Sequence, residues 1–138
     1  MKFTRRASAN WKGTGMEGTG TVSTQSTVLN QTQYSFKTRF ADGVGTNPEE
    51  LIGAAHAGCF TMQFSFLLNE AGFTADNIDT EAKVNFEDGS IVSINLDLTA
   101  TIPNISDEQF QTIAAAAKEK CPISRLFKTE ITLTAKLV

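Results

Sequence analysis

Hydrophobic and polar residues alternate along three segments of the first fifty residues. Residues 3–11 predict a first strand, and residues 19–24 predict a second strand that returns beside it after a glycine-rich loop. Residues 33–40 carry Tyr, Phe, Thr and Phe at every second position and predict a third strand. The N-terminal part of the chain therefore predicts a small sheet.

The same alternation returns in the second half of the chain. Residues 80–86 and 91–102 alternate on either side of Glu87-Asp88-Gly89-Ser90, a sequence that favours a tight hairpin turn. Residues 130–138 alternate again and predict a last strand. A capping box, Ser106-Asp107-Glu108-Gln109, opens a helix through residue 120, which Cys121-Pro122 ends or restarts.

The most informative segment is a helix predicted to follow residue 47. Asn47 can cap it, Pro48 suits its first position, and Glu49 and Glu50 complement the positive end of its dipole. Residues 51–69 contain no Asp, Glu, Lys or Arg, so nearly every face of the helix is apolar and needs cover. One small sheet cannot supply that cover, and we expect a second copy of the chain to do so in a homodimer.

A membrane span is the alternative for a segment of this length. Polar and small residues dilute its apolar character, and acidic residues flank both ends, so we expect no span. The interrupting residues are Gly53, His56, Gly58, Thr61, Gln63, Ser65 and Asn69. The order of elements is then βββα followed by ββαβ, which is an α+β fold.

Composition narrows the class of protein. A chain of 138 residues fits a single domain, 1–138, and 41% hydrophobic with 20% charged residues is typical of a globular protein. A net charge of −3 without a Lys/Arg cluster argues against nucleic acid and anionic membranes as partners. Two cysteines and one histidine are too few for a zinc site, and we expect no metal, no cofactor, no secretion signal and a cytoplasmic location.

Five residues could carry chemistry, and each has an ordinary alternative. Cys59, within the uncharged helix, is by default an inert core thiol, and Cys121 is a surface or half-buried thiol. His56 is by default a neutral, hydrogen-bonded core residue. Arg39 on the third predicted strand and Glu49 in the first helical turn are by default solvent-exposed charges. Taken singly, none of the five indicates a function.

Taken together, two segments resemble the signatures of a known family. Residues 45–60, GTNPEELIGAAHAGCF, resemble the first motif of the OsmC/Ohr family, the osmotically induced and organic hydroperoxide resistance proteins. Cys121-Pro122-Ile123-Ser124 resembles the second motif, at the expected distance. Residues 18–23, 37–40 and 129–133 resemble the OsmC branch, and the similarity runs essentially end to end.

The resemblance implies an intertwined homodimer with a long buried central helix and antiparallel sheets. It also implies a peroxidatic cysteine at Cys59, a resolving cysteine at Cys121, and an Arg–Glu pair near the peroxidatic thiol. Glu49 matches the family's Glu, and Arg39 is the OsmC-branch candidate for the Arg, with Lys37 and Arg125 as the next cations.

Physical chemistry adds two constraints to these implied roles. A buried thiol needs a cation to lower its pKa below the ordinary value of about 8.5, and a guanidinium oriented by Glu49 would supply it. Ten residues of helix span about 15 Å, so Glu49 cannot reach Cys59 on its own helix. We therefore expect the site to combine two protomers.

The predicted function is reduction of organic hydroperoxides, and more weakly of hydrogen peroxide, in oxidative or osmotic stress defence. A dithiol reductant of lipoyl or thioredoxin type would recycle the Cys59–Cys121 disulfide. Phe36, Phe40, Phe60 and Phe64 are candidates for an apolar wall that favours alkyl substrates. The alternatives are a redox-sensing or small-ligand-binding dimer that uses the same cysteines, and a structural dimer with inert thiols.

Overall fold

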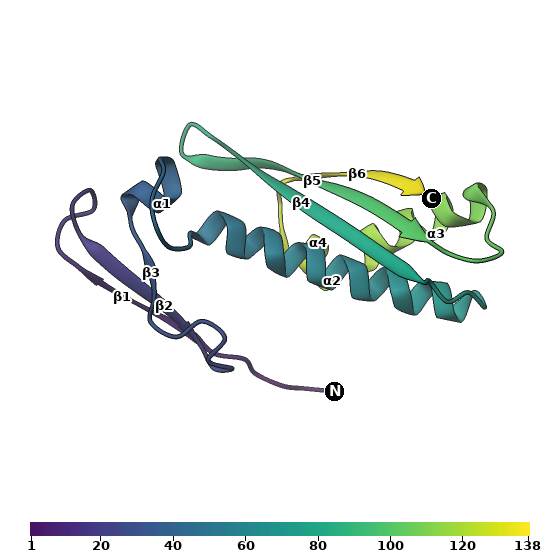
Figure 1. Cartoon of the computed structure of the whole chain (residues 1–138), viewed down its shortest axis with the longest axis horizontal. Coiled ribbons are helices and arrows are strands. Elements are labelled where there is room, and N and C mark those ends of the chain that lie inside the picture. Colours follow the sequence, from purple (N-terminus) through teal and green to yellow (C-terminus); the bar gives the residue numbers. More distant parts are fainter. The chain divides into compact units, whose positions relative to one another are not determined.

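The N-terminal unit, Met1–Leu51, is built on a three-stranded antiparallel sheet. It belongs to a computed structural model that describes all 138 residues and in which Ile52–Val138 form a second unit. Strands β1 (Ala7–Lys12), β2 (Thr19–Thr24) and β3 (Thr32–Tyr34) lie side by side in that order (Figure 1). The three predicted strands are present, although β1 begins later and β3 ends earlier than the alternation predicts.

Gly20 lies at the centre of this sheet, opposite Trp11 of β1 and Tyr34 of β3. A Cβ atom at position 20 would lie 2.4 Å from the Trp11 ring and 2.6 Å from the Tyr34 ring, so only glycine leaves room for both. The two rings pack with their centroids 5.3 Å apart. Gly20 thus allows an aromatic pair to form across three strands.

The sequence prediction is wrong for residues 36–40, which form a short helix, α1 (Phe36–Phe40). Ser35 caps this helix: its Oγ accepts from the Thr38 N–H at 3.3 Å, and its own N–H donates to Thr38 Oγ1 at 2.8 Å. The capping box satisfies backbone donors that a strand would have to pair elsewhere. Phe36 and Phe40 were predicted to lie on one face of a strand. They lie instead one helical turn apart on α1, with their ring centroids 4.9 Å from each other.

Helix α2 (Pro48–Glu70) begins where it was expected. Asn47 Oδ1 accepts from the Glu50 N–H at 2.8 Å, and Asn47 Nδ2 donates to the Thr38 carbonyl at 2.9 Å, which ties the start of α2 to α1. Gly45 makes the preceding turn with φ +129°, and a Cβ there would lie 2.2 Å from the Gln33 carbonyl oxygen. The turn therefore requires glycine.

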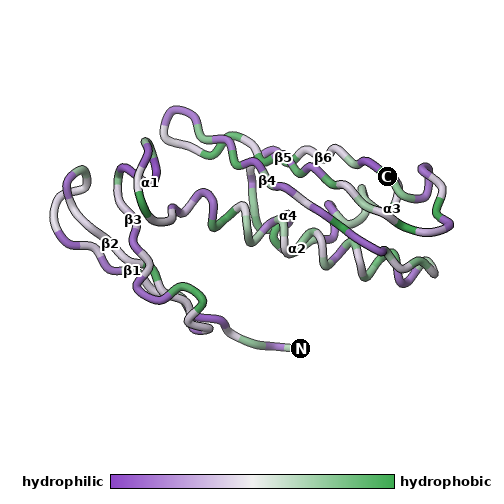
Figure 2. The backbone as a smooth tube through the Cα atoms, viewed as in Figure 1, coloured by the Kyte–Doolittle hydropathy of each residue, from purple (hydrophilic) through white to green (hydrophobic).

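The second unit contains the predicted hairpin. Strands β4 (Asn77–Glu87) and β5 (Ser90–Thr101) are joined by Asp88 and Gly89, both with positive φ, as a type I′ turn requires. Hydrophobic and hydrophilic residues alternate along β5 (Figure 2). Strand β6 (Glu130–Leu137) completes the sheet in the order β4-β5-β6.

One pairing differs from the expected antiparallel arrangement, because β6 runs parallel to β5. Helices α3 (Asp107–Lys120) and α4 (Pro122–Leu126) form the crossover between these two strands. Parallel strands need such a crossover to bring the chain back to the same end of the sheet. The predicted capping box at Ser106 and the break at Cys121 are both confirmed. Helix α1 was not predicted, whereas α4 is the helix restarting after Cys121, and the fold is α+β, as expected.

The core of the second unit lies between the sheet and helices α2 and α3, which both pack on the same face of the sheet (Figure 1). Every second side chain of β5 points into this core, and both helices contribute one apolar stripe. The buried residues of this core are Phe60, Phe64 and Leu68 of α2, Ile94, Leu96, Leu98 and Ala100 of β5, Phe110, Ala114 and Ala117 of α3, and Ile102 and Cys121, which lie just outside these elements. Phe60 and Phe64 are fully buried here and do not form an open wall.

The opposite face of α2 stays exposed in the single chain. Met62 and Phe66 have exposed fractions of 62% and 58%. By length and composition alone α2 could cross a membrane, but a core helix passes the same test, and Phe60, Phe64 and Leu68 pack here in a protein core. Cover of the exposed face by a second protomer stays a prediction.

Candidate active site

The two cysteines, 62 residues apart in sequence, meet in the second unit. Cys59 lies on α2 and is half-buried, whereas Cys121 lies fully buried between α3 and α4; both are free thiols. The two thiols are close enough to influence each other's ionisation, and the backbone N–H of Ile123 also lies beside Cys59 Sγ. Thiols in contact can form a disulfide with little movement of the backbone.

Burial raises the pKa of the Cys59 thiol, and the neighbouring Cys121 thiol raises this pKa further. The Ile123 N–H acts in the opposite direction because it stabilises the thiolate. The groups of the second unit that act on the Cys59 pKa are Cys121 and Ile123, and neither is a cation. The thiol described here is therefore placed for disulfide chemistry but lacks the charge that would activate it.

His56 lies one turn before Cys59 on α2 and is completely buried. Its Nε2 forms a 2.7 Å hydrogen bond with Ser124 Oγ of α4, and its ring meets the edge of Phe127 at 5.6 Å. Burial lowers the pKa of His56 and keeps the imidazole neutral. This agrees with the expected neutral, hydrogen-bonded core histidine.

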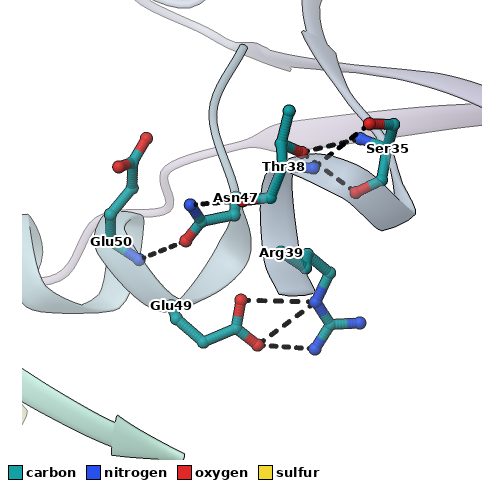
Figure 3. Close-up of polar contacts among 6 residues, drawn as sticks. All are labelled: Ser35, Thr38, Arg39, Asn47, Glu49 and Glu50. Atoms are coloured by element: carbon teal, nitrogen blue, oxygen red, sulfur yellow. Dashed lines mark hydrogen bonds and ion pairs between the residues drawn. The ribbon is translucent and has the colours of Figure 1, made fainter. Parts of the chain in front are cut away.

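Arg39 and Glu49 form an ion pair in the N-terminal unit (Figure 3). Arg39 lies on α1 rather than on a strand, and its Nε and one terminal nitrogen donate to the carboxylate of Glu49, the latter at 2.5 Å. A guanidinium held by two donors on one carboxylate has a fixed orientation. The pair that the family resemblance suggested therefore exists within this unit.

The ion pair changes the acidity of both partners. Hydrogen bonding to Glu49 raises the pKa of Arg39, and hydrogen bonding from Arg39 lowers the pKa of Glu49 despite its partial burial. The guanidinium is thus a permanent positive charge. Its side chain keeps an exposed fraction of 34%, so one part of it is free to meet a thiolate or substrate.

A cavity of about 320 Å³ lies beside Arg39 in the same unit. Its walls are mainly aromatic, and Arg39 stands 4.9 Å from the Phe40 ring centroid. The lining residues are Trp11, Gly15, Tyr34, Ser35, Phe36, Arg39 and Phe40. The cavity combines one fixed positive charge with apolar surface, which suits a ligand with one polar end and an organic group.

Of the four residues predicted for the site, Cys59 lies beside Cys121 in the second unit, and Arg39 pairs with Glu49 in the first. The residues around them were not predicted. Ser124 carried a signal only as the last residue of the second motif. Trp11 and Tyr34 carried none, because their meeting depends on strand register. No group of three or more His, Cys, Asp or Glu side chains is placed to hold a metal ion.

Comparisons with known proteins identify the family of this chain. Residues 41–136 match the family described as OsmC-like protein. The peroxiredoxin OsmC of Escherichia coli (strain K12) is 47% identical over 141 aligned residues, which cover 99% of each chain. This chain belongs to the OsmC family.

Two further relatives from the OsmC/Ohr group are more distant. An organic hydroperoxide resistance protein-like chain from Staphylococcus aureus (strain USA300) is 34% identical over 89 residues, covering 62% of this chain and 64% of its own. The structure of the organic hydroperoxide resistance protein OhrB of Bacillus subtilis matches with a TM-score of 0.71 and 24% identity, covering 99% of this chain and 98% of that one. The OsmC-family chain described here is an enzyme, a peroxidase with a peroxide-detoxifying, stress-related function.

Proposed function

We propose that this protein reduces organic hydroperoxides through Cys59 and Cys121. The observation that carries the proposal is the contact between the two thiols, brought together from α2 and the start of α4. A sulfenic acid formed on Cys59 would find its resolving thiol already beside it. One functional domain, 1–138, a homodimeric state and a cytoplasmic location belong to the same proposal.

The proposed catalytic cycle has three steps: oxidation of Cys59, formation of the disulfide, and its reduction. The Cys59 thiolate attacks the distal oxygen of the hydroperoxide, the O–O bond breaks, and the alkoxide takes up a proton to leave as an alcohol. The Cys121 thiol then attacks the Cys59 sulfenic acid, and a disulfide and water form. A dithiol of lipoyl or thioredoxin type reduces this disulfide by two electrons and is itself oxidised to a disulfide.

Activation of Cys59 requires a positive charge, which Arg39 would supply. Glu49 and Cys59 are ten residues apart on α2, about 15 Å of helical rise, so the Arg39–Glu49 pair of one protomer cannot serve Cys59 of the same helix. We assign the pair to Cys59 of the second protomer. The exposed face of α2, with Met62 and Phe66, supports an association of this kind.

The aromatic cavity beside Arg39 would then receive the organic part of the substrate. Each buried methylene contributes about 0.8 kcal/mol, so two or three of them favour an organic hydroperoxide over hydrogen peroxide roughly ten- to sixtyfold. Phe36 and Phe40 keep the role that we expected for them, and Trp11 and Tyr34 take the place of Phe60 and Phe64.

The experiment is steady-state turnover of cumene hydroperoxide and hydrogen peroxide with dihydrolipoamide, thioredoxin and glutathione as alternative reductants. We expect a higher kcat/KM for cumene hydroperoxide and a preference for the dithiols. Equal rates with both peroxides would contradict the substrate assignment. Reversible disulfide formation without turnover would instead indicate a redox sensor.

A further inference from the structure

Helices α2 and α4 face each other with two matched pairs of residues. His56 and Cys59 lie three residues apart on α2, and Cys121 and Ser124 lie three residues apart at the start of α4. His56 forms a hydrogen bond with Ser124, and the Cys59 thiol lies beside the Cys121 thiol, so the two pairs meet in antiparallel order. The histidine–serine contact is therefore one helical turn away from the thiol contact.

Helix α4 has few polar contacts that fix its position, although Ile123 and the following Phe127 pack against the core. It has only five residues, its N-terminus has no side-chain cap, and a helix of this length is unstable alone. Its first turn closes through the Arg125 N–H on the Cys121 carbonyl at 3.0 Å. Besides those at Cys59, two polar contacts join this turn to other elements: the Cys121 N–H donates to the Ala117 carbonyl of α3 at 2.9 Å, and His56 Nε2 of α2 bonds Ser124 Oγ at 2.7 Å. The second is the one made by a side chain of α4 itself.

The buried state of His56 fixes how this hydrogen bond is made. Nδ1 is buried and has no hydrogen-bond partner. A neutral imidazole carries one N–H, and a buried N–H without a partner costs free energy. The proton therefore belongs on Nε2, which donates to Ser124 Oγ and leaves Nδ1 as an unprotonated acceptor.

We propose that His56 and Ser124 are positioning residues whose hydrogen bond holds α4 in place. In that position the Ile123 N–H and the Cys121 thiol stay beside Cys59 Sγ. The inference rests on the proposed roles of the two cysteines. Ile123 immediately precedes Ser124, so a displacement of Ser124 moves the amide that stabilises the Cys59 thiolate. The same displacement moves Cys121 away from the sulfenic acid that it resolves.

Two variants remove the bond from opposite sides. Ser124→Ala removes the hydroxyl of a half-buried residue, and His56→Phe keeps a ring beside Phe127 but removes both nitrogens. Single-turnover reaction with cumene hydroperoxide across a pH series gives the kinetic pKa of Cys59, and loss of the second thiol gives the rate of disulfide formation. Each variant should raise that pKa by about half a unit to one unit and slow disulfide formation about three- to tenfold.

Ser124→Thr, which keeps the hydroxyl, should restore both values. The matched control is Thr80→Val, which removes a comparable 2.7 Å hydroxyl bond between Thr61 of α2 and Thr80 of β4 and should change neither value. The double variant with both His56→Phe and Ser124→Ala should shift the Cys59 pKa no further than either single variant, because both substitutions remove the same hydrogen bond.

Wild-type values in Ser124→Ala, an equal shift in Thr80→Val, failure of Ser124→Thr to restore them, or additive shifts in the double variant would each overturn the inference. Wild-type protein and Cys59→Ser are assayed beside these variants. If the wild type consumes no hydroperoxide, or Cys59→Ser still consumes it, the proposed function itself fails. An active wild type with unaffected Ser124→Ala removes only the positioning role.

Discussion

The two thiols have different surroundings and different roles in the proposed reaction: Cys59 attacks the hydroperoxide, and Cys121 resolves the sulfenic acid. Cys59→Ser should abolish hydroperoxide consumption, because a hydroxyl near neutral pH is a poor nucleophile toward an O–O bond. Cys121→Ser should consume about one equivalent per site and then stall as a sulfenic acid that over-oxidises. Hydroperoxide loss and intact mass after a single addition measure both outcomes. Full turnover of Cys121→Ser with a dithiol would remove Cys121 from the resolving role.

His56 should make the stability of the protein depend on pH. Burial lowers its pKa in the folded state, so between that lowered value and the ordinary value near 6.5 the unfolded chain binds more protons. The contribution is complete above pH 6.5 and is lost as the pH falls, by at most about 1.4 kcal/mol per pH unit.

Urea midpoints measured between about pH 7.5 and pH 5.5 test this dependence, since Glu49 titrates below that range. We expect the wild-type midpoint to fall across this range. His56→Gln should be flatter across it, whatever its absolute stability. Parallel curves for the two proteins would show that other groups cause the dependence.

At the scale of elements, alternation predicted the strands of the second unit because each of them covers the apolar core on one face only. The same rule failed at Phe36 and Phe40, where Ser35 and Thr38 cap each other and a helix forms instead. The parallel pairing of β5 and β6 was also missed, because strand direction depends on the path of the crossover and not on the residues of the strand.

The candidate site was predictable to a different extent. Cys59 and Cys121 were inconspicuous by periodicity, and their contact could be expected only from the family resemblance. The Arg39–Glu49 pair followed from the same source, although Arg39 lies on a helix rather than on a strand. Ser124 acts through a contact over 68 positions of sequence, and local patterns do not report such contacts.

The turn before α2, which leads into the helix that carries Glu49, offers a test of the requirement for glycine at position 45. Gly45→Ala should destabilise the protein by about 1–3 kcal/mol, because a Cβ would clash with the Gln33 carbonyl at a positive φ. Gly15→Ala is the control, since a Cβ there has no neighbour within 4 Å, and it should stay within about 0.5 kcal/mol of wild type. Urea unfolding followed by circular dichroism measures both; equal midpoints would contradict the requirement for glycine.

At the scale of the whole molecule, the shared site predicts complementation between inactive chains. Cys59→Ser and Arg39→Ala should each be poorly active alone near neutral pH. Unfolded together and refolded as a mixture, they should recover about a quarter of the wild-type activity, because half of the dimers are mixed and each mixed dimer has one complete site.

This result distinguishes a site in which Arg39 serves Cys59 of the other chain from one in which it serves Cys59 of its own chain. If Arg39 served Cys59 of its own chain, a mixed dimer would contain no complete site and mixing would restore nothing. Each variant refolded alone is the control. Sedimentation of the mixture shows whether dimers form at all.

The single tryptophan and single tyrosine of the chain, Trp11 and Tyr34, pack together in the N-terminal unit. Intrinsic fluorescence therefore reports on that unit alone, while Ile52–Val138 emits almost nothing. With the rings 5.3 Å apart, tyrosine passes its excitation energy to tryptophan, and a single emission band results. Both rings also line the cavity beside Arg39, so a ligand that enters it changes this emission directly. The protein thus carries its own optical probe, which needs no label.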